Sequence, residues 1–161
     1  MRSRLLKFCF AMCLIAYLIL LIKLIVFKYP DAMMLDILRG WSMDGFRRHL
    51  AMSNIIPFRT IGSSLFNPQL RVEVTALIYN VVAFVPLGFL LPCIAARFRR
   101  WIQAFAAGLV VSLWFEFVQL VTMLGAADVD DVILNVSGTL IGYGVYQLVG
   151  AGYRAVRTGA N

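Results

Sequence analysis

Charged residues are scarce in this chain, and acidic residues are scarcer still. Only 14% of the 161 residues are charged, with 8 Asp and Glu against 15 Lys and Arg. A water-soluble domain has roughly a quarter of its residues charged and about half of them apolar, whereas 61% of this chain is hydrophobic. The composition therefore argues against a soluble domain and predicts an integral membrane protein.

Cysteine and histidine are also few. The three cysteines, Cys9, Cys13 and Cys93, lie in apolar runs and form no C-x-x-C pair, so we expect buried apolar thiols and no disulfide framework. His49 has no evident partner for a catalytic dyad or a metal site. No serine or cysteine stands beside a base, so hydrolases of that type have no support. Basic residues bracket the apolar runs, and nucleic-acid binding is therefore not expected.

Four apolar runs are long enough to cross a bilayer core, which takes about 20 helical residues. The first follows a basic start but is too long for a secretory signal, so we interpret it as a membrane helix. We predict an all-α integral membrane bundle of four transmembrane helices, which forms a single membrane domain over residues 1–161 with its core at about 54–150. The predicted helices cover about residues 5–27, 74–96, 102–124 and 131–150.

The segment 28–73 is the long stretch that is not predicted to span. Prolines and glycines interrupt it, and arginines alternate with aromatic rings such as Trp41 and Phe58. This mixture is typical of chain at the membrane interface. We predict an interfacial loop with short helices near 32–38 and 44–52, and an ordinary solvated loop is the alternative.

The distribution of basic residues predicts the orientation. Four spans place both termini on one side, and the segments on that side carry basic residues and no acid. The positive-inside rule then places both termini in the cytoplasm. The basic residues of these inner segments are Arg2, Arg4, Lys7, Arg97, Arg99, Arg100, Arg154 and Arg157.

Polar residues gather near the predicted outer surface. Glu116 lies within a spanning helix, where a carboxylate is costly unless it is paired, protonated or facing water, so it indicates a functional site. A structural interhelical hydrogen bond is the alternative. The topology directs the polar residues of three helices toward one outward-facing acidic pocket, capped by the loop. These candidate ligand-binding residues are Asn80, Glu116, Gln119, Asp128, Asp130, Asp131 and Asn135.

Three chemical interpretations of the acids remain open. Asp128 or Asp130 could cap free N–H groups of the last helix. Asp128, Asp130, Asp131 and Glu116 could instead offer oxygens to a divalent cation, although EF-hand spacing is absent. Glu116 could also act as a catalytic acid or base. Further along the last helix, Gly138 and Gly142 share the stripe of Asp131 and Asn135, and this small-xxx-small spacing predicts close helix packing.

Several motifs together carry a family resemblance. They are Asn54-Ile-Ile-Pro-Phe58, Asn80-Val-Val-Ala-Phe-Val-Pro-Leu-Gly-Phe-Leu-Leu-Pro92, the set Ser112, Glu116 and Gln119, and the stretch Asp128 to Tyr143. Over these residues the chain resembles the VanZ-like membrane proteins, a family named for a member linked to teicoplanin resistance. The resemblance implies a small protein of the bacterial inner membrane and adds Asn54 to the candidate residues. The family commonly has an arginine where this chain has Gly125, and Arg59 or Arg71 could supply that charge.

Three functions of different classes follow. We expect a non-catalytic protein that binds a cell-envelope precursor, a lipid-linked ligand or a glycopeptide. The alternative is a metal-dependent enzyme that acts on a lipid or phosphate substrate through Glu116 and the aspartates. A purely structural bundle that packs through Gly138 and Gly142 is the third. The lipid bilayer is an expected partner, and no cofactor is expected apart from a possible divalent cation.

Overall fold

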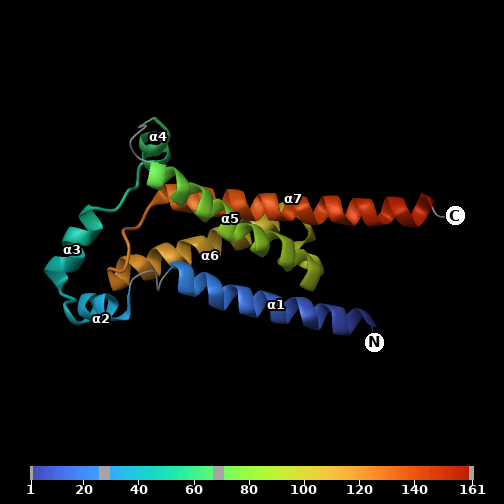
Figure 1. The fold of residues 1–161 in the computed structure, drawn as a ribbon, viewed down its shortest axis with the longest axis horizontal. Coiled ribbons are helices and arrows are strands. Elements are labelled where there is room, and N and C mark those ends of the chain that lie inside the picture. The colour runs from blue at the N-terminus through green and yellow to red at the C-terminus, as the bar shows by residue number, and fades with distance from the viewer. Residues whose placement is uncertain (1, 26–29, 67–70, 160–161) are drawn as a thin grey trace.

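The computed structural model describes residues 2–25, 30–66 and 71–159, and these residues are mostly helical with no strand among them (Figure 1). Its long helices are α1 (Arg2–Ile25), α5 (Arg71–Ile94), α6 (Trp101–Thr122) and α7 (Val129–Gly159). Within them, four segments are long and apolar enough to cross a membrane: Arg4–Ile25, Val74–Ile94, Trp101–Thr122 and Val129–Tyr153. The predicted all-α class and the four spans are confirmed.

Shorter helices connect the long ones. They are α2 (Asp31–Arg39), α3 (Met43–Ala51), α4 (Arg59–Phe66) and the 3₁₀ helix η1 (Ala96–Arg99). The first two match the short helices expected near 32–38 and 44–52, whereas α4 was not predicted. Parts of the predicted loop 28–73, namely residues 28–29 and 67–70, lie outside the described residues.

The two ends of the bundle differ. Both termini lie at one end, which we call the terminal end, and η1 lies there too (Figure 1). The helices α2, α3 and α4 lie at the opposite end, which we call the loop end, together with the turn between α6 and α7 (Figure 1). The polar residues that were singled out in the sequence therefore lie at or near the loop end.

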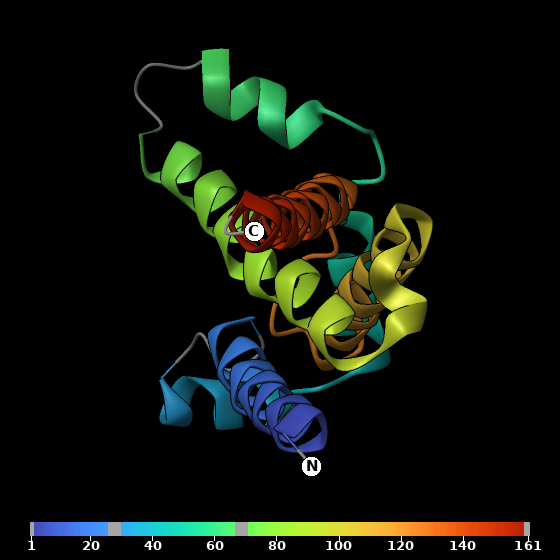
Figure 2. The same cartoon turned by 90° about the vertical axis from the view of Figure 1, so that its right-hand side faces the viewer.

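Helices α5 and α7 form the central pair of the bundle, with α6 packed on α7 and α1 packed mainly on α5 (Figure 2). Glycines bring the central pair into backbone contact. A Cβ atom built on Gly138 would lie 2.0 Å from the carbonyl oxygen of Val81, and one on Gly142 would lie 1.9 Å from that of Val85. Only glycine fits at these two positions, as small-residue packing between membrane helices requires.

The buried apolar core lies where α1, α5 and α6 meet. Phe84 of α5 and Phe115 of α6 pack edge to face, with their ring centroids 6.3 Å apart. The Tyr17 hydroxyl donates to the Ala83 carbonyl oxygen at 2.6 Å and fixes α1 on α5. The expectation of buried cysteines is wrong for Cys9 and Cys13, which are exposed on α1. A thiol is apolar enough to face acyl chains, so exposure on a membrane helix carries little penalty.

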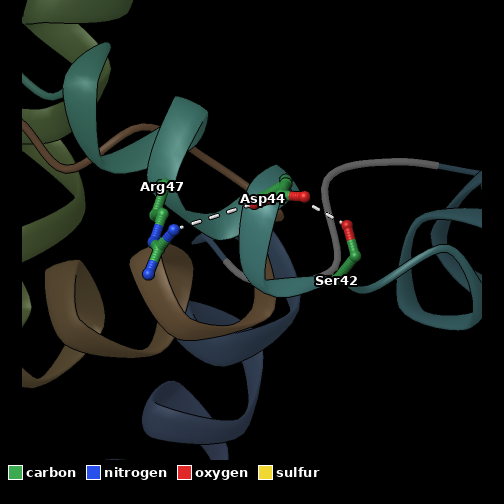
Figure 3. Close-up of polar contacts among 4 residues, drawn as sticks. Ser42, Asp44 and Arg47 are labelled. Atoms are coloured by element: carbon green, nitrogen blue, oxygen red, sulfur yellow. Dashed lines mark hydrogen bonds and ion pairs between the residues drawn. The ribbon is translucent and has the colours of Figure 1, made fainter.

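At the loop end, α3 begins with a side-chain cap. The Ser42 hydroxyl oxygen accepts the Gly45 N–H at 3.1 Å (Figure 3). Arg47 lies 3.9 Å from Asp44, and both side chains are largely exposed, so this ion pair contributes less than about 1 kcal/mol. The Trp41 indole donates to the Val121 carbonyl oxygen at 3.0 Å and holds the α2–α3 connection against the end of α6.

Candidate functional site

Asp128, immediately before α7, is the centre of a hydrogen-bonded network. Its Oδ1 accepts the N–H of Asp130 at 2.8 Å, so Asp128 caps α7, as one of the three interpretations predicted. The same oxygen accepts from the Asn54 side-chain amide at 2.8 Å. Its other oxygen accepts the Thr60 hydroxyl at 2.6 Å. Hydrogen bonds to a charged acceptor are the stronger kind, so this carboxylate binds the loop firmly to α7.

Asp130 caps a different helix from its own. One carboxylate oxygen accepts the N–H of Phe58 at 2.5 Å, and the other accepts those of Thr60 and Ile61 at 2.7 and 3.0 Å. The carboxylate is fully buried and lies at the N-terminus of α4, where the helix dipole favours a negative charge. Phe58 has a φ of 66°, a left-handed conformation that bulky residues rarely adopt. This turn therefore aims the first N–H groups of α4 at Asp130.

The backbone of the Asn54 segment pairs with the turn before α7. The Asn54 N–H donates to the Ala127 carbonyl oxygen at 2.8 Å, and the Val129 N–H donates to the Asn54 carbonyl oxygen at 2.9 Å. The two bonds form one parallel bridge between Asn54 and Asp128. The resemblance implied a role for Asn54, and the structure gives it this position.

Glu116 joins α6 to the same network. It is buried, with 8% of its surface exposed, and its Oε2 accepts the N–H of Asp128 at 2.8 Å. One turn deeper, the Asn135 amide donates to the Ser112 hydroxyl oxygen at 2.9 Å, and both side chains are buried. Among the described residues, the Asn135 amide oxygen has no hydrogen-bond partner. The polar faces of α6 and α7 therefore meet in two layers.

Two other candidates lie apart from Asp128. The Asn80 side-chain amide donates to Asp131 at 2.5 Å, so this pair joins α5 to α7. Gln119 turns toward α1, where its amide donates to the Ile25 carbonyl oxygen at 3.2 Å. Gln119 therefore stabilises the packing of α1 and does not join the acids.

A cavity of about 230 Å³ adjoins the network at the loop end. Glu116 and Asp128 line it together with apolar side chains of α6 and α7 such as Leu113 and Val132. Asn80 lines a second cavity of about 380 Å³, whose other lining residues include Ile25 and Tyr79. Of the candidate residues, Asn54, Glu116 and Asp128 line the first cavity and Asn80 lines the second. We call the first of these the Glu116 cavity.

The acids do not form a common cation cage. Within residues 2–25, 30–66 and 71–159, no three His, Cys, Asp or Glu side chains are placed to hold a metal ion. Three donors bind the two oxygens of Asp128 and three bind those of Asp130, and they occupy most of the roughly four acceptor positions of each carboxylate. The donor sets therefore give no support to a cation held by the candidates Asp128, Asp130, Asp131 and Glu116.

Two residues at the loop end were missed or left without a role in the sequence analysis. Thr60 binds both aspartates, its hydroxyl to Asp128 and its N–H to Asp130. His49 donates from Nε2 to the Gly125 carbonyl oxygen at 2.7 Å and holds α3 against the α6–α7 turn. Arg59, a candidate counter-charge for the acids, is exposed on α4, and the Arg71 side chain lies outside the described residues.

Replacing Thr60 by valine tests its bond to Asp128. Thr60→Val keeps the shape and the N–H but removes the hydroxyl donor at 2.6 Å. We expect a loss of about 1.5–3 kcal/mol of unfolding free energy, the range for a hydrogen bond to a charged group. A thermal melt of the protein in detergent measures it. Ser63→Ala is the matched control, since the exposed Ser63 hydroxyl bonds only within α4, and an equal loss in both variants would contradict the assignment.

Comparison with known proteins agrees with this architecture. A family model described as VanZ/LLP1 matches residues 14–150. Protein VanZ of Enterococcus faecium is 33% identical over 134 residues, which cover 82% of this chain and 70% of that protein. No solved structure matches the chain. The chain therefore belongs to the VanZ/LLP1 family of multi-pass membrane proteins.

Proposed function

We propose that this chain is a non-catalytic protein of the bacterial cell membrane that binds a cell-envelope ligand at the loop end. Both termini lie in the cytoplasm, and binding alters sensitivity to glycopeptide antibiotics of the teicoplanin type. Family membership supports the proposal, because the family is named for a protein linked to teicoplanin resistance. The orientation follows from the acid-free, basic segments at the terminal end.

The observation that carries the proposal is the Glu116 cavity. Three polar residues line it together with apolar side chains: Asn54, Glu116 and Asp128. A ligand group that matches this lining is mainly apolar. The volume of the Glu116 cavity, about 230 Å³, is below the 300–1,000 Å³ of sites that enclose a drug-sized molecule. The cavity therefore accepts one end of a larger molecule, such as the lipid part of an envelope precursor or an apolar group of a glycopeptide.

The hydrogen-bonded network prepares the cavity before a ligand arrives. Asp128, Asn54 and Thr60 hold the loop, and Glu116 binds the Asp128 N–H. A site that is ordered in advance loses less conformational entropy on binding. The acids thus have a structural role at the cavity wall in addition to their charge, and substitution of the acids themselves would confound the two roles.

A cavity-filling substitution separates binding from folding. Leu113 is 50% exposed and lines the Glu116 cavity, so Leu113→Trp fills the space and leaves the network intact. In a strain without its own copy of the gene, we expect Leu113→Trp to lose the teicoplanin phenotype that the wild-type gene restores. Leu148→Trp, at a side chain of α7 that is 74% exposed, is expected to restore it. Full restoration by Leu113→Trp at equal membrane levels would refute the proposal.

A further inference from the structure

A cavity of about 530 Å³ lies at the terminal end, away from the Glu116 cavity. Leu14 and Leu18 of α1 line it together with Leu87 and Leu91 of α5, and α6 contributes small side chains such as Ala107. Because α1 packs mainly on α5, these small side chains of α6 leave a gap beside α1. We call it the α1–α6 cavity.

Two polar groups stand in this apolar lining. Arg97 lines the cavity, and its guanidinium group lies over the Phe98 ring at 4.7 Å from the centroid. Stacking on an aromatic face restrains a guanidinium group and leaves its N–H donors available in the plane. Gln103 also lines the cavity, and its amide oxygen is buried without a hydrogen-bond partner among the described residues.

The charged residues near the α1–α6 cavity, at the terminal end, are all basic. Every Asp and Glu of the chain lies within residues 31–73 or 116–131, so α1, η1 and the first turns of α6 contain basic residues and no acid. Arg97, Arg99 and Arg100 are all exposed, and Trp101 is 60% exposed. A tryptophan among arginines at the end of a membrane helix is typical of headgroup depth. Basic pockets between membrane helices are binding sites for anionic headgroups.

We propose that the α1–α6 cavity binds one anionic glycerophospholipid of the surrounding bilayer. An acyl chain fills the apolar gap between α1 and α6, and the phosphate binds Arg97. Phosphatidylglycerol has both parts and a net negative charge, whereas phosphatidylcholine has a compensating positive charge. This site lies at the opposite end from the Glu116 cavity and does not depend on the function proposed there.

Thermal stability in neutral detergent tests the site with the full-length chain. We add phosphatidylglycerol or phosphatidylcholine with identical acyl chains, and glycerol 3-phosphate as a headgroup without chains. Ligand that binds only the folded state raises the melting temperature in a saturable way. We expect phosphatidylglycerol to raise it, phosphatidylcholine to raise it much less, and glycerol 3-phosphate to leave it unchanged. Equal shifts with the two lipids, or a shift with glycerol 3-phosphate, would overturn the proposal.

Matched variants distinguish lipid binding at a specific site from non-specific attraction of the lipid to the positive charge at this end. Arg97→Gln is expected to weaken phosphatidylglycerol binding about tenfold, the effect of one charged hydrogen bond. Arg4→Gln removes an exposed charge from the same end, ten residues or about 15 Å before Leu14, and is expected to leave binding unchanged. An equal loss in both variants would show that only the net charge matters, and the proposal would fail.

Filling the gap gives a test that involves no charge. Ala107→Trp occupies the space of the acyl chain and is expected to abolish the shift with phosphatidylglycerol, whereas Leu148→Trp on α7 retains it. An unchanged shift in Ala107→Trp would overturn the proposal. If Ala107→Trp does not fold, the comparison of the two lipids on the wild-type protein and the Arg97→Gln and Arg4→Gln pair decide the question.

Discussion

Replacing Gly138 by alanine is expected to destabilise the bundle by about 3 kcal/mol or more, at the upper end of overpacking effects. A Cβ atom at this position would lie 2.0 Å from the Val81 carbonyl oxygen and 2.9 Å from the carbonyl carbon. These atoms belong to the backbone of α5 and cannot rotate away, so α5 and α7 would have to separate. A thermal melt in detergent and the amount of protein in the membrane measure the loss.

Gly144 provides the control on the same helix. A Cβ atom there would meet nothing within 4 Å, and alanine is the better helix former by about 1 kcal/mol. Gly144→Ala is therefore expected to be as stable as the wild type or more stable. Equal stability of Gly138→Ala and Gly144→Ala would mean that α5 and α7 pack further apart than the structure shows.

The four spans could be predicted from the sequence because each one is identified by its own run of apolar residues. A run of about 20 apolar residues needs no knowledge of its neighbours to be identified as a membrane helix. The topology then followed, since successive spans must cross the bilayer in opposite directions. For this reason the contact between Asn80 and Asp131 could be expected from the sequence. Each residue lies in the half of its helix that is nearer the loop end.

The capping of α4 by Asp130 could not be predicted from the sequence in the same way. Spacing along the chain describes which residues share a helix face, but Asp130 binds a backbone N–H 70 residues away. The α4 segment also has no acid in its first turn, so its own sequence contains no capping signal of that kind. Gln119 shows a related limit. Its spacing from Glu116 correctly placed the two residues on one face of α6. That face is wide, however, so Glu116 binds the start of α7 whereas Gln119 binds α1.

The second large effect is expected from Asp130. Asp130→Ala would leave the N–H groups of Phe58, Thr60 and Ile61 without their acceptor. An unsatisfied buried donor is destabilising by about 1–3 kcal/mol, and part of the α4 backbone can reach water, so we expect a total loss of about 3 kcal/mol. Hydrogen exchange of the α4 amides measures the local loosening, and a thermal melt measures the global effect.

Asp44→Ala is the control for Asp130→Ala, because Asp44 is an acid on α3 with its side chain 80% exposed. It is expected to change stability by less than about 0.5 kcal/mol. Equal exchange rates of the α4 amides in the two variants would contradict the capping role of Asp130.

Thr60 also couples the two aspartates, since its N–H binds Asp130 and its hydroxyl binds Asp128. Once α4 is released from Asp130, the Thr60 hydroxyl is no longer held in place for Asp128. Thr60→Val should therefore lower the stability of Asp130→Ala by less than it lowers that of the wild type. A double-mutant cycle measures this difference, with an expected coupling of about 0.5 kcal/mol or more. Strict additivity would show that the two aspartates hold the loop independently, and that α4 can leave α7 without weakening the cap at Asp128.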